Sequence, residues 1–197
     1  MAKTARIVAR EEYFGSVRSS MQSATRTIKG SITGSQPKTP EQEEQVAKIV
    51  EEIKRAKARG VSIQYLLPKS QDRLALASSY KMAGAEIRFH PGLLINDIRY
   101  VVFDHRLTVI GLPSRVGENE PTREGYMIPS EGLAEIFLQQ FESKWAQAIN
   151  YDDYLKELLV EIRNHNPNVS TQLLASELKV PEPEVKRVLG LQGAKIS

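Results

Sequence analysis

Four polar side chains between residues 97 and 114 have types and a spacing that suit an anion site: Asp97, Arg99, Asp104 and Ser114. The guanidinium of an arginine such as Arg99 binds phosphate or carboxylate oxygens in pairs. A carboxylate such as Asp97 is a phosphoryl nucleophile in some enzymes, but its charge repels a phosphodiester. Asp104 can either pair with Arg99 or hold down the turn that it begins. The segment can therefore bind an anion, and it lacks a convincing nucleophile.

The spacing of these residues resembles the signature of the phospholipase D superfamily, His-x-Lys-x4-Asp-x6-Gly-Ser-x-Asn on a strand hairpin. The corresponding positions here are, in order, Asp97, Arg99, Asp104, Gly111, Leu112 and Ser114. Strand patterns over 98–103 and 107–110, joined by a tight turn at 104–106, give the hairpin. The order of elements over residues 5–150 is also similar to one half of that fold.

The resemblance implies a fold whose chemistry has changed. In that family the histidine attacks phosphorus and forms a phosphohistidine, and a second histidine from a paired half protonates the leaving group. Position 97 is an aspartate here, so the resemblance implies no such catalysis. Pairing of halves in the family implies a homodimer. Among single-half members, the chain is similar to archaeal-type transcription regulators that join such a domain to DNA-binding helices.

The three histidines do not restore a catalytic site. His105 lies in the turn, His165 lies in a C-terminal linker, and His90 precedes a Pro-Gly loop that can face the cleft. Their separation gives no metal-ligand spacing. No phosphate loop, dinucleotide fingerprint or serine elbow is found either. We therefore expect neither metal nor cofactor, and we keep His90 as a candidate cleft residue.

Helical and strand patterns alternate through the first half of the chain. Strands are expected over 5–9, 27–33, 61–67, 85–89 and, at an edge, 126–128; helices are expected over 11–25, 40–60, 70–82 and after Ser130. The first helix should bury a stripe of Phe14, Val17, Met21 and Ala24. This order predicts an α/β fold with a mixed sheet sandwiched by helices.

From Tyr151 onward the pattern is helical only. Helices over 154–163, 171–178 and 182–189, with a short turn between the last two, have the helix-turn-helix layout. We therefore expect a phospholipase D-like domain over residues 1–150 and a small all-α module over 151–197. Lys186 and Arg187 on the third helix are candidates for contact with phosphates or base edges, although two glutamates occupy its first turn.

Basic residues are concentrated near the N-terminus. Residues 1–39 hold seven Lys or Arg against two Glu, whereas residues 151–197 hold six basic against seven acidic residues. A basic face attracts polyanions by counterion release, which makes Arg18, Arg26 and Lys29 candidate phosphate contacts. A solvated helix face explains the same charges without a ligand.

Length and composition limit the class of protein. The 197 residues are 41% hydrophobic and 26% charged, an ordinary globular balance. There is no cysteine, no apolar run of about 20 residues, and no room for a signal peptide before the first strand pattern. We therefore expect a cytoplasmic protein without disulfides or a membrane span.

Together these patterns favour a non-catalytic phospholipase D-like domain that binds DNA or another polyanion as a dimeric regulatory protein. Two alternatives stay open. One is a diverged phosphodiesterase or nuclease that uses Asp97, His90 or His105. The other is a protein-interaction scaffold that acts through residues 151–197.

Overall fold

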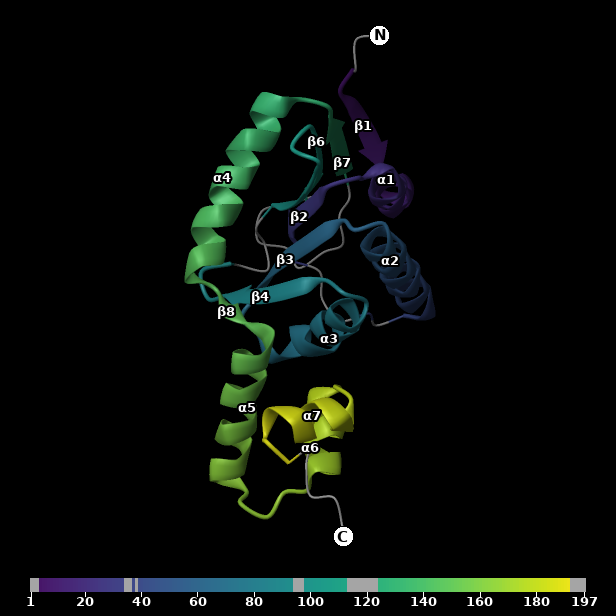
Figure 1. Ribbon diagram of the computed structural model, residues 1–197. Coiled ribbons are helices and arrows are strands. Elements are labelled where there is room, and N and C mark those ends of the chain that lie inside the picture. The colour runs from purple at the N-terminus through teal and green to yellow at the C-terminus, as the bar shows by residue number, and fades with distance from the viewer. Residues whose placement is uncertain (1–3, 34–36, 38, 94–97, 113–123, 192–197) are drawn as a thin grey trace.

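The computed structural model describes residues 4–33, 37, 39–93, 98–112 and 124–191. Within these residues, one eight-stranded sheet carries helices on both faces, and three further helices lie at one end (Figure 1). This confirms the α/β fold with a sandwiched mixed sheet and a helical C-terminal region. None of the described helices is long and apolar enough to cross a membrane.

The sheet has the order β1-β7-β6-β5-β2-β3-β4-β8. Its strands are β1 (Arg6–Ala9), β2 (Thr27–Ser31), β3 (Ser62–Pro68), β4 (Glu86–His90), β5 (Arg99–Phe103), β6 (Leu107–Leu112), β7 (Glu124–Ile128) and β8 (Ile149–Asn150). The central strands β2, β3 and β4 are parallel, and the outer pairs are antiparallel. The expectation that 126–128 forms an edge was wrong, because β1 pairs with the outer side of β7.

Three helices and one short 3-10 turn cover one face of the sheet, and a single helix covers the other (Figure 1). The first group is α1 (Arg10–Ser23), α2 (Pro40–Ala58), η1 (Gln71–Arg73) and α3 (Leu74–Met82); the opposite face carries α4 (Glu131–Gln147). Local sequence fixes where α2 and α4 begin. The hydroxyl of Thr39 accepts a hydrogen bond from the Gln42 amide, and that of Ser130 accepts one from the Leu133 amide.

The buried stripe of α1 differs by one residue from the expected one. Tyr13, Val17, Met21 and Ala24 are buried, whereas Phe14 is 38% exposed. Both aromatic residues fit the helical spacing. Gly125 of β7 leaves room for a ring: a Cβ atom there would lie 2.7 Å from Cδ2 of Tyr13. The packing of α1 over this glycine therefore selects Tyr13.

The C-terminal helices are α5 (Tyr151–His165), α6 (Thr171–Leu178) and α7 (Glu182–Val188). Helix α5 begins directly after β8, where the side chain of Asn150 accepts a hydrogen bond of 2.9 Å from the Asp153 amide. Tyr154 of α5 packs on Phe89 of β4, with ring centroids 4.6 Å apart. The apolar side chains buried by these helices belong to the same cluster as those beneath α1, α2 and α3.

Candidate functional site

Strand register places Arg99 in line with two glycines of the neighbouring strands. Arg99 pairs with Gly111 of β6, and Gly111 pairs with Gly125 of β7. Paired residues of antiparallel strands project to the same side. Two residues without side chains therefore follow Arg99 across the sheet, and Tyr13 of α1 packs over the second of them.

Arg99 also lies where two parallel strands end. The next residue of β5, Tyr100, pairs with Ser31 of β2, and Ser31 pairs with Leu66 of β3. Ligands of open α/β sheets bind outside the carboxyl ends of such strands. The Nε atom of Arg99 donates a hydrogen bond of 2.8 Å to Oγ1 of Thr33, just beyond β2. Arg99 is therefore fixed at the edge of the sheet where a ligand is expected.

The charge of Arg99 is perturbed by its surroundings. Burial lowers the pKa of its guanidinium, and Tyr13 and Arg73 shift this pKa in opposite directions, Tyr13 upward and Arg73 downward. Burial likewise raises the pKa of Tyr13 to about 12, which the positive charge of Arg99 partly offsets. Tyr13, Arg73 and Arg99 therefore lie close enough to interact electrostatically.

Sequence reasoning missed Arg73. This residue ends η1, the short turn that follows β3, and its side chain has no exposed surface. Its three guanidinium nitrogens have no hydrogen-bond partner among the described residues. A carboxylate oxygen of the half-exposed Asp72 lies 3.4 Å from Nη1. The polar sequence Lys69-Ser70-Gln71-Asp72-Arg73 gives no sign of this burial.

Asp104 holds the hairpin turn to the start of β2. Oδ1 accepts hydrogen bonds from the amides of Arg26 (2.8 Å) and Thr27 (3.0 Å), and Oδ2 accepts one from the amide of Thr25 (2.9 Å) and one from its hydroxyl (3.1 Å). Burial acts to raise the pKa of Asp104, but these donors act against it and the pKa lies below its usual value. Asp104 therefore holds down the turn, which is the second of the two roles expected for it.

Basic side chains surround this turn. Nη2 of Arg26 donates to the Asp104 carbonyl at 3.2 Å, and Nη2 of Arg59 donates to the Met21 carbonyl at 2.7 Å. Arg106 lies 3.5 Å from the Asp104 carboxylate, and its side chain is 51% exposed. A pocket of about 550 Å³ opens here, lined by Arg26, Thr27, Asp104, His105, Arg106, Glu131 and Glu135. Arg26 was a sequence candidate, whereas Arg59 and Arg106 were not.

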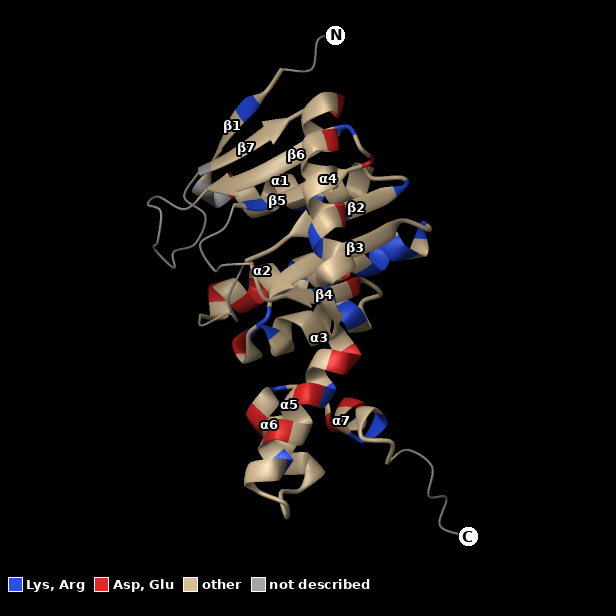
Figure 2. Ribbon diagram, turned by 90° about the vertical axis from the view of Figure 1, so that its left-hand side faces the viewer, with Lys and Arg blue, Asp and Glu red and all other residues tan. Residues whose placement is uncertain are grey.

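The three N-terminal candidates do not share one face. Arg18 lies on α1, on the face of the sheet covered by α1, α2 and α3. Lys29 projects from β2 to the opposite face, where its ammonium pairs with Glu142 of α4 and lies 5.9 Å from the centre of the Phe141 ring. Figure 2, which views the α4 side, shows basic and acidic segments interspersed.

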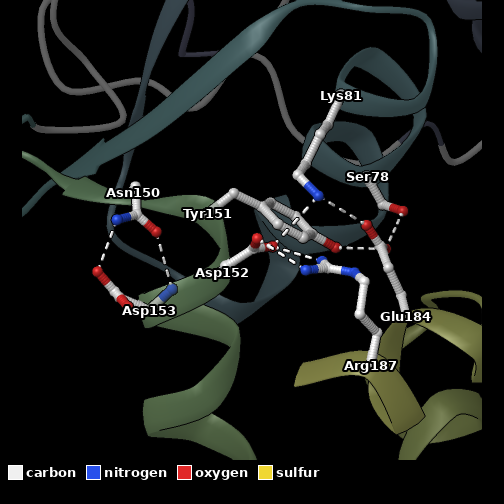
Figure 3. Close-up of polar contacts among 8 residues, drawn as sticks. All are labelled: Ser78, Lys81, Asn150, Tyr151, Asp152, Asp153, Glu184 and Arg187. Carbon is white, nitrogen blue, oxygen red and sulfur yellow. Dashed lines mark hydrogen bonds and ion pairs between the residues drawn. The ribbon is translucent and has the colours of Figure 1, made fainter. Parts of the chain in front are cut away.

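The basic residues of α7 are paired within the chain. The Arg187 guanidinium donates two hydrogen bonds to Asp152 of α5, at 2.9 and 2.6 Å, and Lys186 pairs with Glu182 at 3.0 Å. Glu184, expected to be unfavourable for DNA, points toward α3 and the start of α5 instead (Figure 3). Its carboxylate accepts hydrogen bonds from Ser78 (2.8 Å), Tyr151 (2.9 Å) and Lys81 (3.3 Å).

The remaining candidates are a histidine and two residues outside the described chain. His90 ends β4, which two strands, β2 and β3, separate from β5, and its Nδ1 accepts a hydrogen bond of 3.0 Å from the Gly92 amide. Burial lowers the pKa of His90, and the charge of Lys144 lowers it further, which favours the neutral ring that accepts this bond. Asp97 and Ser114 lie outside the described residues. No cluster of potential metal ligands occurs in the described parts of the chain.

Comparison with known proteins identifies the fold. No family model matches the chain, and no match was found among curated proteins. Among solved structures, it is similar to Nuc, a phospholipase D family member from Salmonella typhimurium, with a TM-score of 0.59 and 18% identity over 75% of this chain and 97% of that one. NucT from Helicobacter pylori is similar with a TM-score of 0.55 and 13% identity over 75% and 98% of the two chains.

A third similar structure is TrmBL2, an archaeal chromatin protein whose mode of DNA binding its structure shows. The TM-score is 0.56 and the identity 17%, over 75% of this chain and 54% of TrmBL2, so the match spans about half of that protein. The expected resemblance is confirmed at the level of structure: the chain has the phospholipase D-like fold.

Proposed function

We propose that this chain is a non-catalytic phospholipase D-like protein that binds DNA or another polyanion as a homodimer, in a regulatory role. One observation carries the proposal: the site edge formed by β2, β3 and β5 holds a fixed guanidinium, Arg99, while the nucleophile position of the motif is Asp97. Arg99 supplies positive charge for a phosphate, and an aspartate at position 97 is an unconvincing nucleophile toward a phosphodiester, so this site favours binding of phosphates over their hydrolysis. The fold shared with the DNA-binding protein TrmBL2 supports DNA as the polyanion.

The exposed arginines around the Asp104 turn are the strongest candidates for contact with a DNA backbone. Arg26 and Arg106 are exposed, and they lie beside the pocket at the amino ends of the parallel strands. Arg18 would add a contact from α1. Lys29, Lys186 and Arg187 have carboxylate partners at 3.0 Å or less, closer than the 3.5 Å between Arg106 and Asp104, so each is expected to contribute less net binding energy.

Fluorescence anisotropy on a random-sequence duplex, at several salt concentrations, tests this proposal. The double variant Arg26→Gln with Arg106→Gln should bind every sequence more weakly, and the log–log salt slope should flatten by about 0.9 for each phosphate that the variant no longer neutralises. The double variant Lys48→Gln with Lys54→Gln is the control, because these lysines lie on α2 and pair with neighbouring glutamates. Equal effects of both pairs, or no binding by the native chain at low salt, would refute the proposal.

The module is tested on the same duplex. If Lys186 and Arg187 reach base edges, replacing each by Ala costs about 1–3 kcal/mol and reduces sequence preference. Unchanged affinity and preference would leave the module without a reading role and would favour the scaffold alternative.

Two further measurements test the absence of catalysis and the dimer. The native chain should not hydrolyse bis-p-nitrophenyl phosphate or single-stranded DNA; turnover that is abolished in His90→Ala or His105→Ala would favour the nuclease alternative.

Light scattering should give about twice the chain mass of 22.1 kDa, since a half of this fold alone leaves its cleft uncovered. A monomer over a wide concentration range would refute the dimer.

A further inference from the structure

The turn between β5 and β6 holds a histidine in an unfavourable backbone conformation. The amide of Arg106 donates a hydrogen bond of 3.1 Å to the Phe103 carbonyl, and the two residues between them, Asp104 and His105, have φ values of 50° and 59°. A turn with positive φ at both central residues is of type I′, which favours Asn or Asp at the first and Gly at the second. Asp104 meets this preference. His105 does not, and it therefore destabilises the turn relative to glycine.

The side chain of His105 is available to a ligand. His105 is exposed and lines the pocket of about 550 Å³ at this turn, a volume within the usual range of small-molecule sites. Asp104 lies five residues from Arg99 along an extended strand, roughly 17 Å at about 3.4 Å per residue. The pocket is therefore separate from the edge of the sheet where Arg99 lies.

The pocket has a basic side and an acidic side. The guanidinium groups of Arg26 and Arg106 are both held at Asp104, one 3.2 Å from its carbonyl oxygen and the other 3.5 Å from its carboxylate. The acidic side is α4, where Glu131 and Glu135 are exposed and, being four residues apart, share one face of the helix. The arginines attract a bare phosphate and the glutamates repel it. The pocket therefore suits a ligand that carries both negative charge and hydrogen-bond donors.

We infer that this pocket takes one unpaired nucleotide of a nucleic acid whose base carries an amino group. Arg26 and Arg106 then bind the phosphate, and the ring of His105 stacks on the base. The two glutamates accept hydrogen bonds from the amino group, as acidic side chains do from N4 of cytosine. Thymine has no amino group, and its carbonyl oxygens are repelled by carboxylates.

The inference rests on the proposed nucleic-acid binding and names the form of strand that this pocket accepts. A base within a duplex is stacked and paired, so it enters a pocket only after it leaves the stack. A base in a single strand is free to enter. We therefore expect a preference for single strands that contain cytosine over single strands of thymine alone.

Fluorescence anisotropy with a deoxycytidine nonamer and a thymidine nonamer, equal in length and charge, tests the base preference. The native chain should bind the deoxycytidine nonamer at least about fivefold more tightly. The double variant Glu131→Gln with Glu135→Gln keeps the size of both side chains, but its amides also donate hydrogen bonds, so this preference should largely disappear. The double variant Glu44→Gln with Glu51→Gln, at exposed residues of α2, is the control and should keep it.

Three outcomes of this comparison would overturn the inference. They are equal binding of the two nonamers by the native chain, binding of neither, and an unchanged preference in the variant of Glu131 and Glu135.

Substitution of His105 separates a ligand contact from a structural role. His105→Gly removes the ring and relieves the positive φ, so the Tm should stay the same or rise. Its affinity for both nonamers should nevertheless fall at least about fivefold, because the stacking contact is lost. His165→Gln, at an exposed histidine of α5, is the control and should bind as the native chain does. Unchanged affinity of His105→Gly, or a lower Tm, would overturn the inference.

The same chemistry has two sources, a free nucleotide or a nucleotide within a strand. Calorimetry with deoxycytidine 5′-monophosphate and with the deoxycytidine nonamer distinguishes them. Tighter binding of the nonamer, with a steeper salt dependence, assigns the pocket to a strand; binding of the monophosphate that the nonamer does not exceed assigns it to a free nucleotide. A chain that binds the random-sequence duplex but does not prefer the deoxycytidine nonamer keeps the proposed function and loses this inference. A chain that prefers this nonamer but does not bind the duplex loses only the proposed duplex binding.

Discussion

Replacement of Asp104 tests whether the aspartate of the motif is a structural residue. Its two carboxylate oxygens accept four hydrogen bonds from residues Thr25 to Thr27, between 2.8 and 3.1 Å. Its own backbone has a φ of 50°, a left-handed conformation that Asp and Asn tolerate better than other side chains. Asp104→Ala removes both the acceptor and this tolerance. Asp104→Asn keeps the backbone preference and one of the two acceptor oxygens.

The expected loss in free energy of unfolding follows from the hydrogen-bond donors that Asp104→Ala leaves without an acceptor. A buried donor without an acceptor costs about 1–3 kcal/mol, but Thr25 and Arg26 are exposed, so water satisfies part of the loss. The left-handed conformation adds about 1 kcal/mol for Ala. We expect Asp104→Ala to lower the free energy of unfolding by about 3–4 kcal/mol and Asp104→Asn by about 1–2 kcal/mol.

Urea unfolding followed by the fluorescence of Trp145 measures both values. Trp145 is the single tryptophan, is 8% exposed and stacks on Phe141, so it reports loss of the core beneath α4. The lowered pKa of Asp104 predicts a pH dependence as well. Its stabilisation is complete above the usual Asp pKa of about 3.9 and is lost as pH falls through the lower, folded-state value. The difference between native chain and Asp104→Asn should therefore shrink in acid.

Three results would refute this reasoning. A loss below about 1 kcal/mol for Asp104→Ala would mean that the hydrogen bonds to the turn contribute little net stability. Equal losses for Ala and Asn would mean that backbone conformation and the retained oxygen do not matter. If stability is unaffected and only anion binding changes, Asp104 acts in a ligand site rather than in the turn.

Three other perturbations have defined outcomes. Gly125→Ala would place a Cβ atom 2.7 Å from the Tyr13 ring, and it should lower stability by about 1–3 kcal/mol in urea unfolding; a neutral effect would show that α1 shifts freely. The hydrogen bonds from Arg187 hold the pKa of Asp152 below its usual value, so the packing of α7 on α5 should weaken as pH falls through that lowered pKa; amide hydrogen exchange in α7 that does not rise in acid would contradict this. A chain ending at Asn150 should still fold if the proposed division is right, with a lower Tm because Phe89 loses the Tyr154 ring; a molten product in near-UV circular dichroism would place α5 within the first domain.

Local sequence was enough to predict most elements of this fold. The bounds of α6 agree with the expected 171–178, because Ser170 caps its start and the apolar spacing continues to Leu178. The strand hairpin and the spacing between positions 97 and 114 indicated the phospholipase D-like fold before any tertiary contact was known. β8 was missed because its two residues are too short to show an alternation.

Only the tertiary structure decided which charges are available and where they lie. Lys29 pairs with Glu142, 113 residues away, and Glu184 accepts a hydrogen bond from Ser78, 106 residues away. Arg73 is buried although its neighbours in the sequence are polar. Periodicity reports which side of its own helix or strand a residue occupies. The partner, the burial and therefore the free energy of a charge depend on segments that the sequence places far apart and that meet only when the sheet and its helices assemble.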